Sequence, residues 1–211
     1  MKNRTVILST ALCLAPILLG VSMYGQLPDM VPTHFDMNGV PDGWSSRPVA
    51  VFGMPLFLAA VNLLCHWGMK KALQRDDRKV APDVLINMVG WIVGIISVIV
   101  VPMSLFMAVG VDVPISFVMN ILLAVVFLVV GNYLPKCKMN AYIGIKLPWT
   151  YSSEENWRRT HRLGGFVWVA AGLLLLGNLV FNSELLLMLL ILGAILIPGV
   201  YSYCLYRNET A

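Results

Sequence analysis

Two polar segments of the chain carry the side chains whose types and spacing could support chemistry. In the first, residues 26–48, His34 and Asp36 are two positions apart, so on an extended strand they point to the same side. With Asp42 near them, they could hold a cation or bind a peptide amine. One histidine and scattered carboxylates are a small ligand set for a metal. We expect a partner-recognition surface or a rigid lid here, and no metal site.

Prolines and glycines shape this first segment, residues 26–48, which is called the outer segment because the charge distribution described below predicts that it lies outside the cell. Four prolines and two glycines between Leu27 and Pro48 exclude a continuous helix. Asn38-Gly39 and Pro41-Asp42-Gly43 are turn signals, because glycine accepts positive φ and aspartate caps its own turn. The segment is therefore expected to have a defined structure. Its candidate binding residues are His34, Asp36, Asn38, Asp42, Trp44 and Arg47.

The second polar segment, residues 133–162, predicts a short amphipathic helix that begins near Ser153. In a capping box at this point, the serine accepts a backbone N–H three residues on and Glu155 reaches back. The acidic start and basic end of the helix match the helix dipole. Trp157 and His161 are four residues apart and share one face. The candidate binding residues of this inner segment are Asn140, Lys146, Trp149, Glu154, Trp157, His161 and Arg162.

Two interpretations of the inner segment stay open. Its helix could lie at the membrane interface, with Trp157 at the depth of the headgroups and the arginines on lipid phosphate. Alternatively, the segment could be a docking surface for a cytoplasmic partner.

Six apolar stretches free of Asp, Glu, Lys and Arg surround these segments, and each is about long enough to cross the hydrocarbon of a bilayer. They cover residues 5–25, 49–68, 84–108, 115–134, 163–181 and 185–206. The chain is 58% hydrophobic and only 12% charged, which excludes an ordinary soluble domain. Backbone groups in lipid must be satisfied internally, so these stretches are expected to be helices. We therefore predict one all-α membrane domain over residues 1–211.

Basic residues fix the expected orientation. Every lysine and arginine except Arg47 falls in segments that would share one side of the membrane. Because such residues stay in the cytoplasm, both termini and residues 133–162 are expected inside, and residues 26–48 outside. The net charge of +4 would then face the anionic inner leaflet, so it does not indicate direct nucleic-acid binding.

Each long polar segment joins the first and second helices of a three-helix half. Because three is odd, the halves would have opposite orientations, as in an inverted repeat. The local match between residues 41–46 and 148–153 is thin, so chance stays an alternative.

Several residues inside the apolar stretches predict how the helices pack. Gly90 and Gly94 form a small-xxx-small face. Prolines are expected to bend the helices at positions 16, 55, 102 and 198. Four amides could bond between helices or form a polar pathway: Asn62, Asn87, Asn120 and Asn178. His66 adjoins Trp67 at a helix end and is interpreted as an interfacial residue.

An enzyme is not expected. The sequence has no Ser-His-Asp set, no paired membrane aspartates and no His-Glu-x-x-His motif. His34 and His161 are expected on opposite sides of the membrane, so they cannot share a site. The four cysteines have no paired spacing, which argues against a disulfide framework and a zinc site. No cofactor is indicated.

Together, the two polar segments resemble the SdpI family of bacterial multi-pass membrane proteins. The outer resemblance includes Val31-Pro32-Thr33-His34-Phe35-Asp36 and Asn38-Gly39-Val40-Pro41-Asp42-Gly43-Trp44. The inner one includes Asn140, Ile143-Gly144-Ile145-Lys146-Leu147-Pro148-Trp149-Thr150, Trp157 and Thr160-His161-Arg162. Lys146 and Leu147 replace the arginine and threonine usual in the family, so the bidentate guanidinium and the hydroxyl are lost.

The resemblance implies a protein of the bacterial cell membrane that gives immunity to a secreted toxic peptide, or signals its presence to a cytoplasmic regulator. The partners implied are membrane lipids, a toxin peptide outside and a transcriptional repressor inside. The alternative function is a small-molecule or ion transporter or channel built on an inverted repeat. The spans hold no ionisable acid or base apart from His66, which counts against ion coupling.

Overall fold

The computed structural model describes residues 3–36, 38–75, 81–140 and 143–210. Six helical spans within this part of the chain are long and apolar enough to cross a membrane. Their bounds are Asn3–Met23, Val49–Lys71, Asp83–Ala108, Ile115–Lys136, Glu154–Phe181 and Glu184–Glu209. The prediction of an all-α membrane protein with six spans is therefore confirmed.

The chain divides into two compact units. Unit 1 comprises residues 1–71 and 87–116, and unit 2 comprises residues 72–86 and 117–211. The first three spans thus lie almost wholly in unit 1 and the last three in unit 2, which agrees with the predicted three-helix halves. Their inverted orientation stays a prediction. The thin sequence match is no structural repeat, since residues 41–46 form a strand and Pro148–Tyr151 a 3-10 helix.

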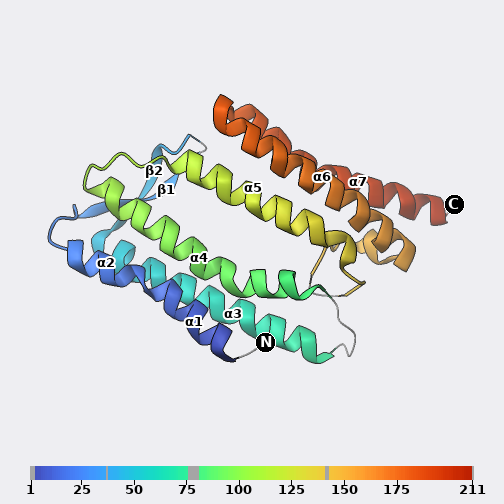
Figure 1. Ribbon diagram of the computed structural model, residues 1–211, viewed down its shortest axis with the longest axis horizontal. Helices are drawn as coiled ribbons and strands as arrows, with labels where there is room; N and C mark the ends of the chain where they lie inside the picture. Colours follow the sequence, from blue (N-terminus) through green and yellow to red (C-terminus); the bar gives the residue numbers. More distant parts are fainter. Residues whose placement is uncertain (1–2, 37, 76–80, 141–142, 211) are drawn as a thin grey trace. The chain divides into compact units, whose positions relative to one another are not determined.

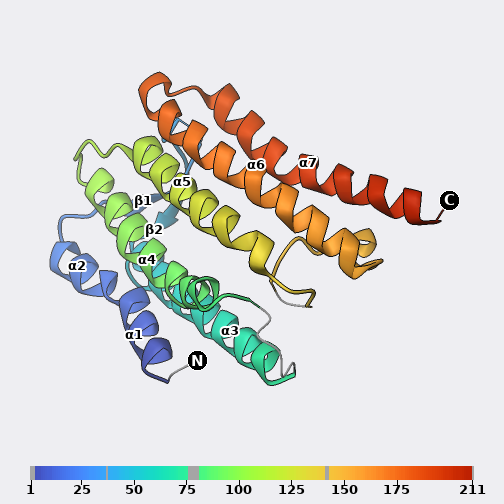
Figure 2. The same ribbon diagram turned by 45° about the vertical axis from the view of Figure 1, so that its right-hand side comes forward.

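Unit 1 begins with two helices instead of the single helix predicted over residues 5–25. Helix α1 covers Asn3–Leu14 and α2 covers Pro16–Met23 (Figure 1; Figure 2). The break falls at Pro16 because proline has no N–H for the preceding turn and its ring clashes with that turn. A π-helical turn, Val49–Gly53, leads into α3.

The remaining helices of unit 1 are longer. Helix α3 covers Met54–Arg75 and α4 covers Asp83–Ala108. Helix α4 continues through Pro102, so this proline does not end it.

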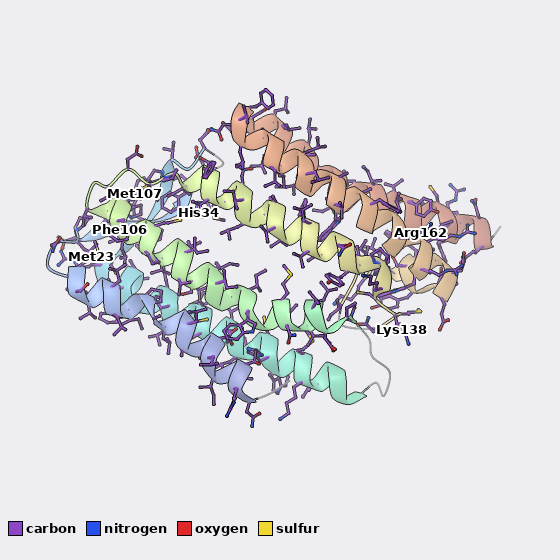
Figure 3. All side chains as sticks on the ribbon, viewed as in Figure 1. Met23, His34, Phe106, Met107, Lys138 and Arg162 are labelled. Atoms are coloured by element: carbon purple, nitrogen blue, oxygen red, sulfur yellow. The ribbon has the colours of Figure 1, made fainter. Side chains whose placement is uncertain are left out.

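The outer segment forms a β-hairpin. Strand β1, Met30–Phe35, pairs antiparallel with strand β2, Pro41–Ser46. Val31 is fully buried and packs in one cluster with Val51, Val101 and Leu105. Figure 3 shows His34 at the same end of unit 1 as Met23, Phe106 and Met107. The expectation of a defined structure is confirmed, and the hairpin is anchored on the helix ends by its apolar side chains.

A buried polar cluster links α1 to α3. Nε2 of His66 lies 2.8 Å from Oγ of Ser9, and the Asn62 side-chain amide donates to Ser9 and to Thr10, at 3.0 Å each. His66 is 5% exposed. The interpretation of His66 as an interfacial residue is therefore wrong, because its ring faces the interior of unit 1. The prediction that Asn62 bonds between helices is confirmed.

The other three predicted amides behave differently. Asn120 is buried, whereas Asn87 is exposed, so the prediction for Asn87 is wrong. Asn178 is buried, but its side chain accepts from the Ser183 N–H at 3.0 Å and donates to the Ser183 carbonyl at 3.1 Å. It therefore closes the turn after its own helix and does not join two helices.

Unit 2 is built on three long helices. Helix α5 covers Ile115–Tyr133, α6 covers Glu154–Phe181 and α7 covers Glu184–Thr210. Helices α6 and α7 run antiparallel side by side, and the two residues between them allow only a tight turn (Figure 2). The core that these two helices form with α5 contains Ala124, Phe127, Ala171, Leu175 and Ala194. Helix α7 continues through Pro198.

The inner segment contains two short 3-10 helices, η2 over Leu134–Lys136 and η3 over Pro148–Tyr151. The helix predicted near Ser153 does begin there, since Ser153 is its N-cap. However, it runs on without interruption into the predicted fifth span. The expected short helix and that span are one 28-residue helix, α6, which continues through Gly164 and Gly165.

The predicted small-xxx-small face of Gly90 and Gly94 can be tested through the packing of α4 in unit 1. A Cβ on Gly94 would lie 2.9 Å from the Ser9 carbonyl oxygen and 3.2 Å from Leu12, whereas one on Gly177 would have nothing within 4 Å. Gly94→Leu should therefore destabilise the fold by about 1–3 kcal/mol through overpacking. Thermal unfolding in detergent measures it, with Gly177→Leu as the matched control. Equal melting temperatures for the two variants would contradict the close helix crossing.

Candidate functional site

The hairpin presents one exposed polar and aromatic face. Nδ1 of His34 lies 2.5 Å from Oδ1 of Asp42, and the two side chains are 76% and 49% exposed. Trp44 follows Asp42 by two residues on β2, so it shares that face, and it is 53% exposed. An ion pair in water contributes little to stability. The face is thus built from residues that the fold itself scarcely needs.

Asp36 does not join this pair. Its Oδ1 accepts the backbone N–H groups of Asn38 at 2.9 Å and Val40 at 2.8 Å, and so it closes the hairpin loop. The Asn38 carbonyl accepts from the Ser116 hydroxyl at 3.0 Å. In the described ranges, no three His, Cys, Asp or Glu residues group so as to hold a metal ion. Of the three predicted neighbours, only His34 and Asp42 come together.

Arg47 holds the base of the hairpin. Its guanidinium donates to Asp29 at 2.7 Å and to the Pro28 carbonyl at 3.2 Å, and it lies 5.4 Å from the centre of the Tyr24 ring. These contacts join the end of β2 to the chain that enters β1. Arg47 was predicted as a binding residue, but this geometry makes it a positioning residue.

His161 is the centre of the inner segment and is fully buried. Its Nδ1 lies 2.8 Å from the Trp157 carbonyl, and its Nε2 accepts the Ile145 N–H at 3.0 Å. A ring that donates at one nitrogen and accepts at the other is neutral. The His161 ring also stacks on the Trp157 ring, with the two ring centroids 4.0 Å apart. Nδ1 is therefore engaged within α6, and Nε2 holds the loop against that helix.

Gly144 lets the loop approach this stacked pair. Its φ is +129°, and a Cβ there would collide with the rings of His161 and Trp157. Trp157 is 2% exposed, and its indole N–H donates to the Cys137 carbonyl at 2.9 Å. Because the loop covers its ring, Trp157 does not face the headgroups directly, and its depth in the membrane stays a prediction.

Asn140 closes the first part of the same loop. Its amide donates to the Lys138 and Ile143 carbonyls, and its oxygen accepts the Ile143 N–H at 2.8 Å. The Tyr151 hydroxyl donates to the Asn140 carbonyl at 2.9 Å. Burial raises the pKa of Tyr151, which keeps this donor protonated. Asn140 was predicted to bind a partner, but its side chain is engaged within the segment.

A buried hydrogen-bond network joins this segment to α7. The Asn156 oxygen accepts from the Ser202 hydroxyl at 2.7 Å and from Thr160 at 3.0 Å, and its amide donates to the Ser202 carbonyl at 2.9 Å. The hydroxyls of Thr150 and Ser202 lie 2.9 Å apart. Asn156 and Ser202 were not predicted from the sequence. Two features of the sequence could have indicated them. Ser202 is a hydroxyl residue within an apolar stretch, and Asn156 lies four residues before Thr160, on the same helix face.

A second connection lies at the helix ends. The Ser153 hydroxyl accepts the Asn156 N–H at 3.0 Å, which confirms the predicted cap. Glu209, near the end of α7, accepts from Ser153 at 2.8 Å and from Ser152 at 3.1 Å. Glu209 was not predicted from the sequence either.

Glu155 does not reach back to the cap as predicted. It pairs with Arg158 at 2.5 Å and with Arg159 at 2.6 Å, because these guanidiniums lie one turn along the same helix face.

The predicted inner residues therefore divide into two groups. Asn140, Trp157 and His161 are buried. The Trp149 indole N–H donates to the Gly199 carbonyl at 3.2 Å, so this residue fastens η3 to α7. Lys146, Glu154 and Arg162 are exposed. Figure 3 shows Arg162 and Lys138 at one end of unit 2. Only the exposed residues are available to a partner.

Comparisons with known proteins match both polar segments. Residues 136–202 match the SdpI/YfhL protein family, and residues 11–59 match a domain of unknown function, DUF1648. Immunity protein SdpI of Bacillus subtilis (strain 168) is 23% identical over 209 residues, which cover 98% of this chain and 97% of that protein. No solved structure matches the chain.

The first family match covers the buried loop around His161 and the network to α7, and the second reaches from the first span through the hairpin into α3. Together with the six spans, these similarities identify a multi-pass bacterial membrane protein. The resemblance predicted from the two polar segments is confirmed, since residues 136–202 match the SdpI/YfhL protein family and residues 11–59 match DUF1648.

Proposed function

We propose that this chain is a membrane immunity protein, in which the hairpin recognises a secreted toxic peptide outside the cell. The observation that carries the proposal is the similarity to Immunity protein SdpI over nearly the full length of both chains. A non-enzymatic role fits the chemistry of the inner segment. Burial raises the pKa of the Cys137 thiol to about 11, and both ring nitrogens of His161 are engaged.

The exposed face of the hairpin supports peptide recognition. The Asp42 carboxylate can accept from a peptide amine, and Trp44 offers a large apolar surface beside it. Tryptophan is enriched among residues that dominate binding energy, since it buries much area at a small entropic cost. The buried Val31 and the Arg47–Asp29 pair fix the hairpin beneath this face. Little conformational entropy is therefore lost when a peptide binds.

The inner segment fits the output side of such a protein. Its exposed Lys146, Glu154 and Arg162 can contact a cytoplasmic regulator, while its buried side is hydrogen-bonded to α6 and α7. A peptide outside could change the exposure of these residues only if it binds two states of the protein with different affinities.

A transporter or channel is the second candidate function. One observation favours it: Ser9, Asn62 and His66 form a buried polar cluster between two spans. Interhelical hydrogen bonding accounts for the same cluster, and the near full-length similarity to an immunity protein carries more weight. Solute flux into liposomes containing the purified protein separates the two functions.

The orientation can be tested by cysteine labelling. In a background with Cys65 and Cys204 replaced, an impermeant maleimide should label His34→Cys in intact cells, and Glu154→Cys only after permeabilisation. The two remaining cysteines are buried and should stay unlabelled. Labelling of Glu154→Cys in intact cells would contradict the proposed orientation, which the distribution of lysine and arginine supports.

The proposed recognition face can be tested by survival. Deleting the gene from its host should sensitise the cells to peptides secreted by the parent strain, and the wild-type gene should restore growth. The double variant with His34→Ala and Trp44→Ala should raise sensitivity by at least about tenfold, because it removes the exposed contacts.

Its matched control is Val40→Ala, which alters an exposed apolar residue in the loop of the same hairpin. Membrane abundance should be equal for all variants. Full protection by the double variant at normal abundance would remove the hairpin face from the mechanism, and no sensitivity in the deletion strain would overturn the immunity function.

A further inference from the structure

A cavity of about 650 Å³ lies on unit 2 between the end of α5 and the beginning of α6. Its polar part is lined by Glu155, Arg158, Arg159 and Arg162. Its apolar part is lined by Pro135, Phe166 and Val169, among others. This volume lies within the range of small-molecule sites in proteins. None of the interactions that hold the inner segment together uses this cavity.

The charges in the cavity are unbalanced. Arg158 and Arg159 share the single carboxylate of Glu155, at 2.5 Å and 2.6 Å. In the described part of the chain, Arg162 has no ion-pair partner. It also lines a second cavity of about 380 Å³, with Leu163 and Tyr201. Three guanidiniums around one carboxylate attract an anion, and their planar donors suit phosphate oxygens.

The cavity changes from charged to apolar along α6. From Glu155 to Val169 the helix rises about 21 Å at 1.5 Å per residue, so the two ends of the site are separated by about the thickness of one lipid leaflet with its headgroups. Phe166 is 67% exposed although it lies in a span. A soluble anion would use only the charged end, whereas a phospholipid would use both.

Close backbone packing forms the floor of the cavity. A Cβ on Gly165 would lie 2.6 Å from the Pro135 ring and 2.7 Å from the Gly131 carbonyl oxygen. Helices α5 and α6 therefore meet at these glycines, and larger residues cannot replace them without separating the helices. The floor is fixed by the fold, while the arginines at the mouth are exposed.

We propose that this cavity is a binding site for an anionic phospholipid. The headgroup phosphate binds Arg162, supported by Arg158 and Arg159, and an acyl chain lies along Phe166 and Val169. The lipid site does not rest on the proposed immunity function, since it requires only that α6 spans the membrane, although it shares Arg162 with the proposed output side. Its expected orientation toward the cytoplasm also agrees with an anionic inner leaflet.

Native mass spectrometry tests this site on the full-length protein. Released from detergent with equal amounts of phosphatidylglycerol and phosphatidylcholine, the wild type should retain phosphatidylglycerol preferentially. Arg162→Gln should lower that preference by about fivefold, since one basic residue near an anionic headgroup contributes about 1 kcal/mol. Arg162→Lys should retain part of it.

Lys70→Gln is the matched control, because it removes the same charge from an exposed residue of unit 1, outside the cavity. The melting temperature should rise with added phosphatidylglycerol in the wild type and in Lys70→Gln, and less in Arg162→Gln. If Lys70→Gln lost the preference for phosphatidylglycerol as much as Arg162→Gln, the preference would come from the general surface charge. That result would overturn the proposed site. Retention of both lipids equally, or displacement of phosphatidylglycerol by inorganic phosphate, would also overturn it.

Discussion

The structure depends on one constraint, which is that polar groups inside a bilayer must be satisfied by the protein itself because no water is present. The spans meet it with helical backbones, and several polar side chains within them meet it by bonding to other polar side chains. Asn62 bonds to Ser9 and Thr10 across two helices, and Asn156 bonds to Ser202 and Thr160. Such bonds also fix which helices are neighbours, since each donor has few acceptors within reach.

A related constraint explains the inner segment, because backbone groups that are buried by packing also lose contact with water. A loop that leaves a helix end has free backbone groups, and here His161, Asn140 and the Trp157 indole satisfy several of them. Because Gly144 brings the loop onto the stacked rings, the loop is packed like a core. The hairpin of unit 1 follows a different plan. Its apolar residues anchor it on the helix ends, and its polar residues remain exposed. The two polar segments thus have different capacities for partners.

Several candidate residues make contacts within the fold that the sequence did not indicate. Trp157, His161 and Asn140 have the residue types of a binding surface, and Arg47 has the type of a ligand contact, yet all four are used to hold the chain. His66 follows an apolar stretch and resembles an interfacial residue, but its ring faces α1. A sequence gives the chemistry of a side chain and its spacing along one element. It does not give the partner from another element that engages it.

By itself, the sequence determined the six spans, the turn at Asn38-Gly39, the helix start at Ser153 and the family resemblance, because these depend on local composition, short-range spacing and residue types within one segment. The turn signal at Pro41-Asp42-Gly43 was wrong, since these residues begin strand β2. Only the tertiary structure decided which candidate residues are buried, since burial depends on contacts such as Asn156 with Ser202 that are distant in the chain. It also decided that Glu155, Arg162 and Val169 line one cavity, because that requires a second helix against α6.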